Sequence, residues 1–270
     1  KTIYNTEEQI EDSKHPVSYT LETNGYDMNN LKDIVEIPIY TVPEWTFEYS
    51  LGGYFETAKS QYANLSYDLP ETIIKISDYN KIAKLYGEEE YSLNDDEFMV
   101  LCDFEQLLNM RNEALKQDSD IEINGKTYHA KYNECQYGFI MMSVSEMNGG
   151  IIVVPDSFEF KDENIEQYFL AANYNAETEE EKVELEKVLA GEVDSELFDN
   201  LSEKGIDLEG MTRISLIESS KGLSTIIIFI SIYLGIIFLI ASSAILALKQ
   251  LTESSDNKQR YTILRKIGCD

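Results

Sequence analysis

Two features of the sequence could carry chemistry: a possible phosphate-binding loop and the two histidines. Residues 125–127 (GKT) resemble the end of a phosphate-binding loop, but the glycine required five residues earlier is Asp120. The flanking residues also predict a β-hairpin instead of a strand–loop–helix unit, so ATP binding here is rejected. His15 and His129 lack the paired spacing of metal ligands, and we expect a surface or structural role for each.

The cysteines and the acidic clusters also predict no reactive site. Cys269 follows the membrane segment described below, so Cys102–Cys135 is the one pair available for a disulfide within the main domain, and two free, buried thiols are expected. The acidic runs 88–90 and 179–181 lack the spaced Asp/Asn–Gly pattern of a calcium loop. Without a G-x-S-x-G motif, the sequence predicts no catalytic, cofactor or metal site.

The charge balance of the chain is strongly acidic. Its 270 residues include 50 acidic and 22 basic side chains, for a formal net charge of −28. Such a surface repels nucleic acid, whose binding depends on Lys and Arg contacts to phosphate. It attracts cations and cationic peptides, or simply keeps the domain soluble. The apolar fraction of 43% is sufficient for a packed core.

An uncharged apolar stretch at residues 223–248 predicts a transmembrane helix. At 1.5 Å per residue it is roughly 40 Å long, which exceeds the ~30 Å hydrocarbon core of a bilayer. Ser231, Gly235 and Ser242 lie along it. Small residues allow close approach of another helix, so we expect these three to pack against other transmembrane helices.

The flanking charges predict the orientation of this span. Five basic residues follow it, at 249, 258, 260, 265 and 266, whereas the preceding residues are strongly acidic. Because positive charge marks the cytoplasmic side, we expect an extracytoplasmic domain at 1–219, a transmembrane helix at 220–249 and a cytoplasmic coupling segment at 250–270, in the plasma membrane. No signal sequence is visible at Lys1, and we expect an earlier transmembrane helix to precede this segment.

The extracytoplasmic part mixes strand and helix patterns. Apolar patterns predict strands at 34–41, 72–77, 98–102, 138–144, 150–155 and 166–174. Asn124-Gly125 predicts a hairpin turn. Helices are predicted at 79–87 after an Asp78 cap, at 104–116, at 177–189 and after Asp194, and 211–217 is a last strand or a stalk. The fold class is therefore α+β, with helices on a largely antiparallel or mixed sheet, followed by one transmembrane helix and a short cytoplasmic amphipathic helix.

The final segment holds the most specific pattern. Tyr261, Leu264 and Ile267 can share one face of a helix that has basic residues beside it. Such a helix can rest on anionic lipid or dock in a groove on a cytoplasmic partner.

Residues 261–268 (YTILRKIG) resemble the motif aromatic-x-(I/L)-L-R-x-(I/L/A)-G of FtsX/MacB-like permeases of ABC transporters. Residues 247–256 (ALKQLTESSD), 77–80 (SDYN) and 152–156 (IVVPD), with the length of the outer domain, resemble more narrowly the bacitracin-resistance permeases of Gram-positive bacteria.

This resemblance implies a permease subunit with further helices on both sides of the segment. It implies a separate cytoplasmic ATPase, which Tyr261, Leu264, Arg265 and Gly268 are predicted to contact. It also implies export, resistance or sensing of antimicrobial peptides, often with a partner histidine kinase. ATP hydrolysis is expected on the other subunit, so this chain is predicted not to be an enzyme.

Two alternatives remain at this stage. One is a membrane-anchored binding or sensor module without a transport role. The other is an anchored wall-modifying enzyme, for which the sequence shows no catalytic constellation. The predicted extracytoplasmic ligands are cationic peptides or their complexes with lipid-linked wall precursors, because the domain is acidic.

Overall fold

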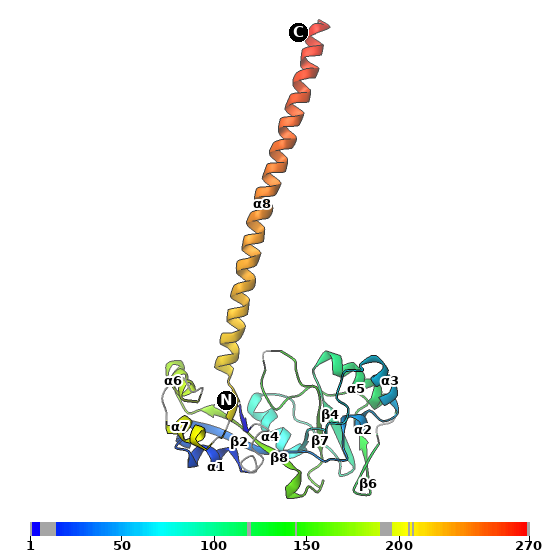
Figure 1. Ribbon diagram of the computed structural model, residues 1–270, viewed down its shortest axis with the longest axis vertical. Coiled ribbons are helices and arrows are strands. Elements are labelled where there is room, and N and C mark those ends of the chain that lie inside the picture. Colours follow the sequence, from blue (N-terminus) through cyan, green and yellow to red (C-terminus); the bar gives the residue numbers. More distant parts are fainter. Residues whose placement is uncertain are drawn as a thin grey trace. The chain divides into compact units, whose positions relative to one another are not determined.

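The computed structural model describes residues 2–5, 15–117, 120–143, 145–189, 196–204, 206 and 208–268. The chain divides into two compact units, Lys1–Leu216 and Ile217–Asp270. The N-terminal unit contains the sheet, and the C-terminal unit consists of most of helix α8, Arg213–Lys266 (Figure 1).

The N-terminal unit is built on one nine-stranded mixed sheet with the strand order β5-β6-β4-β7-β3-β2-β8-β1-β9. β3 pairs with β7 in parallel, whereas β2 and β8 form a long antiparallel pair. The mixed sheet with its helices confirms the predicted α+β class. The strands are β1 Thr2–Asn5, β2 Leu31–Tyr40, β3 Ile73–Lys75, β4 Glu97–Leu101, β5 Ile121–Ile123, β6 Lys126–Ala130, β7 Ile151–Val154, β8 Ile165–Tyr174 and β9 Leu208–Met211.

Seven helices besides α8 are described in the N-terminal unit. They are α1 Val17–Thr23, α2 Phe47–Leu51, α3 Phe55–Gln61, α4 Ile76–Tyr86, α5 Glu105–Gln117, α6 Glu179–Leu189 and α7 Glu196–Glu203, with short 3₁₀ turns at Met28–Asn30, Gly52–Tyr54 and Asp162–Asn164. Gly87 ends α4 with φ 81°, as predicted. Asn124 and Gly125 join β5 to β6 with φ 54° and 75°, which confirms the predicted hairpin.

The central strands supply two hydrophobic cores because successive side chains point to opposite faces of a sheet. Ile74 and Val153 belong to the core that also contains Tyr79 of α4. Their neighbours Ile73 and Ile152 belong to the other core, which contains Trp45. All four residues of β7 are buried, as expected of a strand covered on both faces.

The strand predicted at 138–144 is wrong for residues 138–143, which form no strand. The carbonyl oxygens of this segment accept side-chain donors instead of pairing with a strand: Asn148 Nδ2 lies 2.8 Å from the Gly138 oxygen, and the Tyr86 hydroxyl lies 3.0 Å from the Ile140 oxygen. A Cβ on residue 138 would lie 2.5 Å from the Tyr79 hydroxyl oxygen. The apolar residues of this segment therefore pack locally around tyrosines.

Two further predicted boundaries differ from the structure, and a third lies outside the described residues. Asp78 is not an N-cap, because α4 begins at Ile76 directly after β3 and Asp78 lies in its first turn, 2.7 Å from Lys81 Nζ. The segment predicted at 211–217 is divided between the end of β9 and the start of α8. Asp194 lies outside the described residues.

The predicted short cytoplasmic helix is not a separate element. α8 runs continuously from Arg213 to Lys266. Residues 249–260 (KQLTESSDNKQR) contain no proline or glycine, so nothing in their sequence interrupts helical hydrogen bonding.

Candidate functional site

The central part of α8 is apolar on every side. Its most apolar window has a mean hydropathy of 2.7, and none of that window is buried in this chain. The consecutive residues from Ile226 to Ile230 are all at least half exposed, so the apolar surface surrounds the helix. A surface of this kind is stable in lipid, where the helix satisfies its own backbone hydrogen bonds.

The predicted packing residues form one open stripe on this helix. Ser231, Gly235 and Ser242 are spaced i, i+4, i+11, which brings them to the same side of an α-helix. Ser231 Oγ donates to the Ile227 carbonyl at 2.8 Å, so its polar group is satisfied within the helix. A Cβ at residue 235 would meet no atom within 4 Å, and a neighbouring helix could approach closely here.

The predicted coupling residues also share one face, near the C-terminal end of α8. Tyr261, Leu264, Arg265 and Gly268 follow the spacing i, i+3, i+4, i+7. Tyr261 is 72% exposed and Leu264 is 45% exposed. Gly268 has φ 88°, and its N–H donates to the Arg265 carbonyl just beyond the end of the helix. The face combines apolar area with a guanidinium, which suits an apolar groove with an acidic rim.

A buried carboxylate lies at the start of α8. Glu186 of α6 accepts hydrogen bonds from the hydroxyls of Thr212 and Tyr174. Thr212 and Ser215 cap the first turn of α8 reciprocally: Ser215 N donates to Thr212 Oγ1 at 3.1 Å, and Thr212 N donates to Ser215 Oγ at 3.2 Å. Burial is the largest cause of the raised pKa of Tyr174, and the Glu186 carboxylate raises it further. The Glu186 carboxylate therefore joins α6 and β8 to the residue from which α8 starts.

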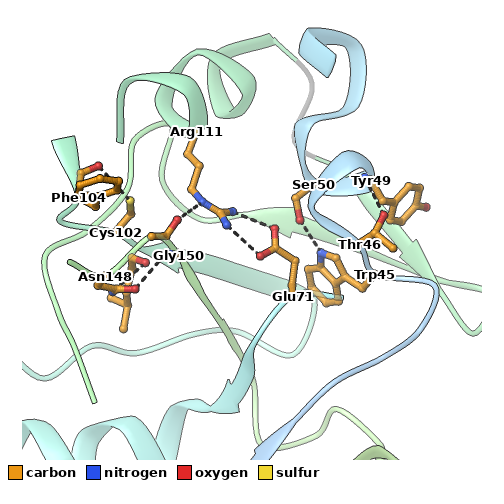
Figure 2. Close-up of polar contacts among 12 residues, drawn as sticks. Trp45, Thr46, Tyr49, Ser50, Glu71, Cys102, Phe104, Arg111, Asn148 and Gly150 are labelled. Atoms are coloured by element: carbon orange, nitrogen blue, oxygen red, sulfur yellow. Dashed lines mark hydrogen bonds and ion pairs between the residues drawn. The ribbon is translucent and has the colours of Figure 1, made fainter. Parts of the chain in front are cut away.

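A second polar network lies beneath α5 (Figure 2). Arg111 donates two hydrogen bonds of 2.9 Å to the Glu71 carboxylate and one of 2.8 Å to the Gly149 carbonyl. The two charged side chains are 6% and 4% exposed, and the Arg111 guanidinium lies 4.5 Å from the centre of the Phe47 ring. Burial opposes the charge of Arg111, but Glu71 outweighs it and the pKa of Arg111 is raised. The network joins α5 to the residues before β3 and β7.

Sequence patterns did not predict either network, because their members are far apart in the chain and charged residues are normally exposed. The one local signal is the pairing of Glu186 with Leu189 three residues later, which places Glu186 on the buried side of α6.

The two histidines are exposed and contact neighbouring side chains. His129 Nδ1 lies 2.7 Å from Asp120 Oδ1 on the surface, and the His15 ring lies 5.2 Å from the ring of Tyr19. Among the described residues, no group of three or more His, Cys, Asp or Glu side chains could hold a metal ion.

The long apolar helix and the mixed α/β unit define a segment of a membrane protein, and comparison with known proteins agrees. No protein-family model matches the chain. The chain is 31% identical over 167 residues to the bacitracin export permease protein BceB of Bacillus subtilis, a match that covers 57% of this chain and 24% of that protein. It is 43% identical over 56 residues to the BceB protein of Halalkalibacterium halodurans, covering 21% of this chain and 9% of that protein.

The chain is therefore homologous to a segment of bacitracin export permeases, and the resemblance described above is confirmed. It spans about a quarter or less of the length of the two relatives.

Proposed function

We propose that this chain is part of the permease subunit of an ABC transporter that exports or senses antimicrobial peptides. In this proposal a separate cytoplasmic ATPase binds the Tyr261–Gly268 face of α8. Homology to the bacitracin export permeases is the observation that carries the proposal. The exposed apolar span of α8 supports it, because a permease must cross the membrane.

The continuity of α8 supports a mechanical role for this helix. A rigid helix from Thr225 to Tyr261 is roughly 54 Å long at 1.5 Å per residue, more than the thickness of a bilayer. A displacement of the Leu264–Arg265 face by the ATPase would therefore move the start of the span without an intervening loop. We propose that Ser231, Gly235 and Ser242 contact other transmembrane helices of the same protein during this movement.

Co-purification with the ATPase tests the coupling face. Leu264→Asp with Arg265→Glu in the full-length protein replaces the apolar contact and reverses the charge. The matched control is Ile263→Asp with Lys266→Glu, which makes the same charge changes on the opposite side of α8. We expect the first variant to lose the ATPase and the control to retain it. Equal retention by both variants would contradict the assignment.

The extracytoplasmic ligand is proposed to be a cationic peptide such as bacitracin-type antimicrobials, alone or with a lipid-linked wall precursor. The acidic excess of the chain supports this, because it attracts cations over about a Debye length. Titration of the full chain in detergent with a Lys-rich amidated peptide should show binding at low salt that weakens as salt increases. A lack of binding at low salt counts against electrostatic capture, whatever the result for the ATPase. Signalling to a partner histidine kinase remains a proposal from the family.

A further inference from the structure

The two cysteines of the N-terminal unit lie next to each other, although they are far apart in the sequence. Both are free thiols; Cys102 is buried and 2% exposed, whereas Cys135 is partly exposed. The two thiols interact with each other electrostatically. The structure therefore brings together two thiols with different access to solvent.

Backbone pairing holds the two residues in this position. Gln136 forms a parallel bridge with Leu101: Gln136 N donates to the Val100 carbonyl at 2.8 Å, and Cys102 N donates to the Gln136 carbonyl at 3.1 Å. On the other side, Cys135 N donates to Asn112 Oδ1 of α5 at 2.7 Å. Cys102 and Cys135 are thus fixed by β4 and by α5.

A buried positive charge lies beside the pair. Arg111 interacts electrostatically with both sulfur atoms, and Figure 2 shows the Cys102 thiol beside the Phe104 carbonyl, in the same region as Arg111. The neighbouring Cys135 thiol lowers the pKa of Cys102; burial opposes this shift, and Arg111 supports it. Cys102 and burial raise the pKa of Cys135, and Arg111 opposes that shift. An arginine beside a pair of thiols favours the thiolate, which is the reactive form of cysteine.

We propose that Cys102 and Cys135 form a redox-active pair that closes to an intramolecular disulfide under oxidising conditions. The bond closes a loop of about 33 residues, which contains α5 and the β5–β6 hairpin. It joins this module to the end of β4. The inference concerns covalent chemistry of the N-terminal unit and does not depend on the transport role.

The reaction uses a small disulfide oxidant such as glutathione disulfide. Cys135 first loses its proton to solvent, and the charge of Arg111, which interacts with both sulfur atoms, favours the resulting thiolate. The Cys135 thiolate, which is the more exposed, attacks the oxidant and releases one glutathione thiolate. Cys102 then loses its proton and its sulfur displaces the second glutathione. Two thiols and one disulfide become one disulfide and two thiols, and the oxidant takes up the two electrons.

Mass spectrometry of the full chain with Cys269→Ala tests the proposal. The protein is incubated in detergent with glutathione disulfide, quenched in acid, unfolded and alkylated. We expect Cys102 and Cys135 to resist alkylation and to appear as one cross-linked peptide pair. Recovery of both as alkylated thiols, or as separate glutathione adducts, would overturn the proposal.

Single variants test the order of the two steps. With Cys102→Ser, the mixed disulfide on Cys135 cannot be resolved and should accumulate. With Cys135→Ser, buried Cys102 should stay reduced. Glutathione on Cys102 in the second variant, with none on Cys135 in the first, would contradict the assigned order.

Thermal unfolding supplies a second measurement on the unsubstituted pair. Loop closure should raise the melting temperature of the oxidised chain by roughly 8–15 °C over the reduced chain. An equal or lower melting temperature would show that the bond forms only in a distorted fold, which contradicts the geometry described above.

Discussion

Removing the charge of Glu71 should be among the most destabilising single changes in the N-terminal unit. Glu71→Gln keeps the shape of the side chain but leaves the Arg111 guanidinium, 6% exposed, without its counter-charge. Breaking one side of a buried ion pair costs about 3–5 kcal/mol of the free energy of unfolding. The Phe47 ring, 4.5 Å from the guanidinium, contacts Arg111 with or without the substitution, so it does not offset this cost.

The double variant Glu71→Leu with Arg111→Met should be more stable than Glu71→Gln. It removes both charges, so no ion is left buried. The remaining cost is the Gly149 carbonyl, which loses the donor at 2.8 Å; an unsatisfied buried acceptor costs about 1–3 kcal/mol. The two sites should therefore be strongly non-additive.

Urea unfolding followed by tryptophan fluorescence measures both effects. Trp45 is the single tryptophan, is fully buried, and lies beside Glu71 in Figure 2. The matched control is Glu113→Gln, which breaks the exposed Glu113–Lys116 pair of α5, the helix that carries Arg111. This change should leave the urea midpoint unchanged. The reasoning is refuted if Glu71→Gln costs no more than this control, or if the double variant loses as much as the sum of its single changes.

Three further predictions concern other positions. Gly150→Ala should lower the free energy of unfolding by at least ~1–3 kcal/mol, because Gly150 has φ 145° and an added Cβ would lie 2.2 Å from the Arg111 guanidinium. The control is Gly53→Ala, where the nearest atom to the added Cβ lies at 4.0 Å. Equal urea midpoints for the two variants would contradict this prediction. Glu186→Ala should expose the amides at the start of α8 to faster hydrogen exchange, and unchanged exchange would refute the role of Glu186 in holding Thr212. His129 should titrate by NMR above its usual pKa of 6.5, because Asp120 stabilises its charged form; its stabilising effect is present below pH 6.5 and is lost as pH rises through the raised pKa, and a pKa at or below 6.5 would contradict this.

Local patterns predicted much of the fold. The Asn124-Gly125 turn, the glycine that ends α4 and the alternation along the central strands depend on neighbouring residues, so one sequence is sufficient to find them. The apolar residues near 138–143 gave the same strand pattern, but their carbonyl groups bind Tyr86 and Asn148. The conformation of this segment therefore depends on residues outside it, and the apolar pattern of residues 138–143 gives no information on those residues.

The polar networks were not predictable for the same reason. Glu71 and Arg111 are 40 residues apart, and nothing local marks either as buried. On α8, the change from apolar to charged residues predicted a break between the transmembrane helix and a separate cytoplasmic helix. Backbone hydrogen bonds of a helix form with apolar and charged side chains alike, and no proline or glycine interrupts them at residues 249–260. The helix α8 therefore continues to Lys266.

In the proposed function α8 crosses the membrane, so the acidic N-terminal unit and the Tyr261–Gly268 face lie on opposite sides of it. Two matched changes, Ser60→Cys and Ser255→Cys, place exposed thiols on the N-terminal unit and beyond the span. They are introduced singly into the full-length protein with its native cysteines replaced, and intact cells are treated with a membrane-impermeant maleimide. We predict labelling at residue 60 in intact cells and at residue 255 only after lysis. Labelling of both in intact cells, or of residue 255 alone, would contradict the account.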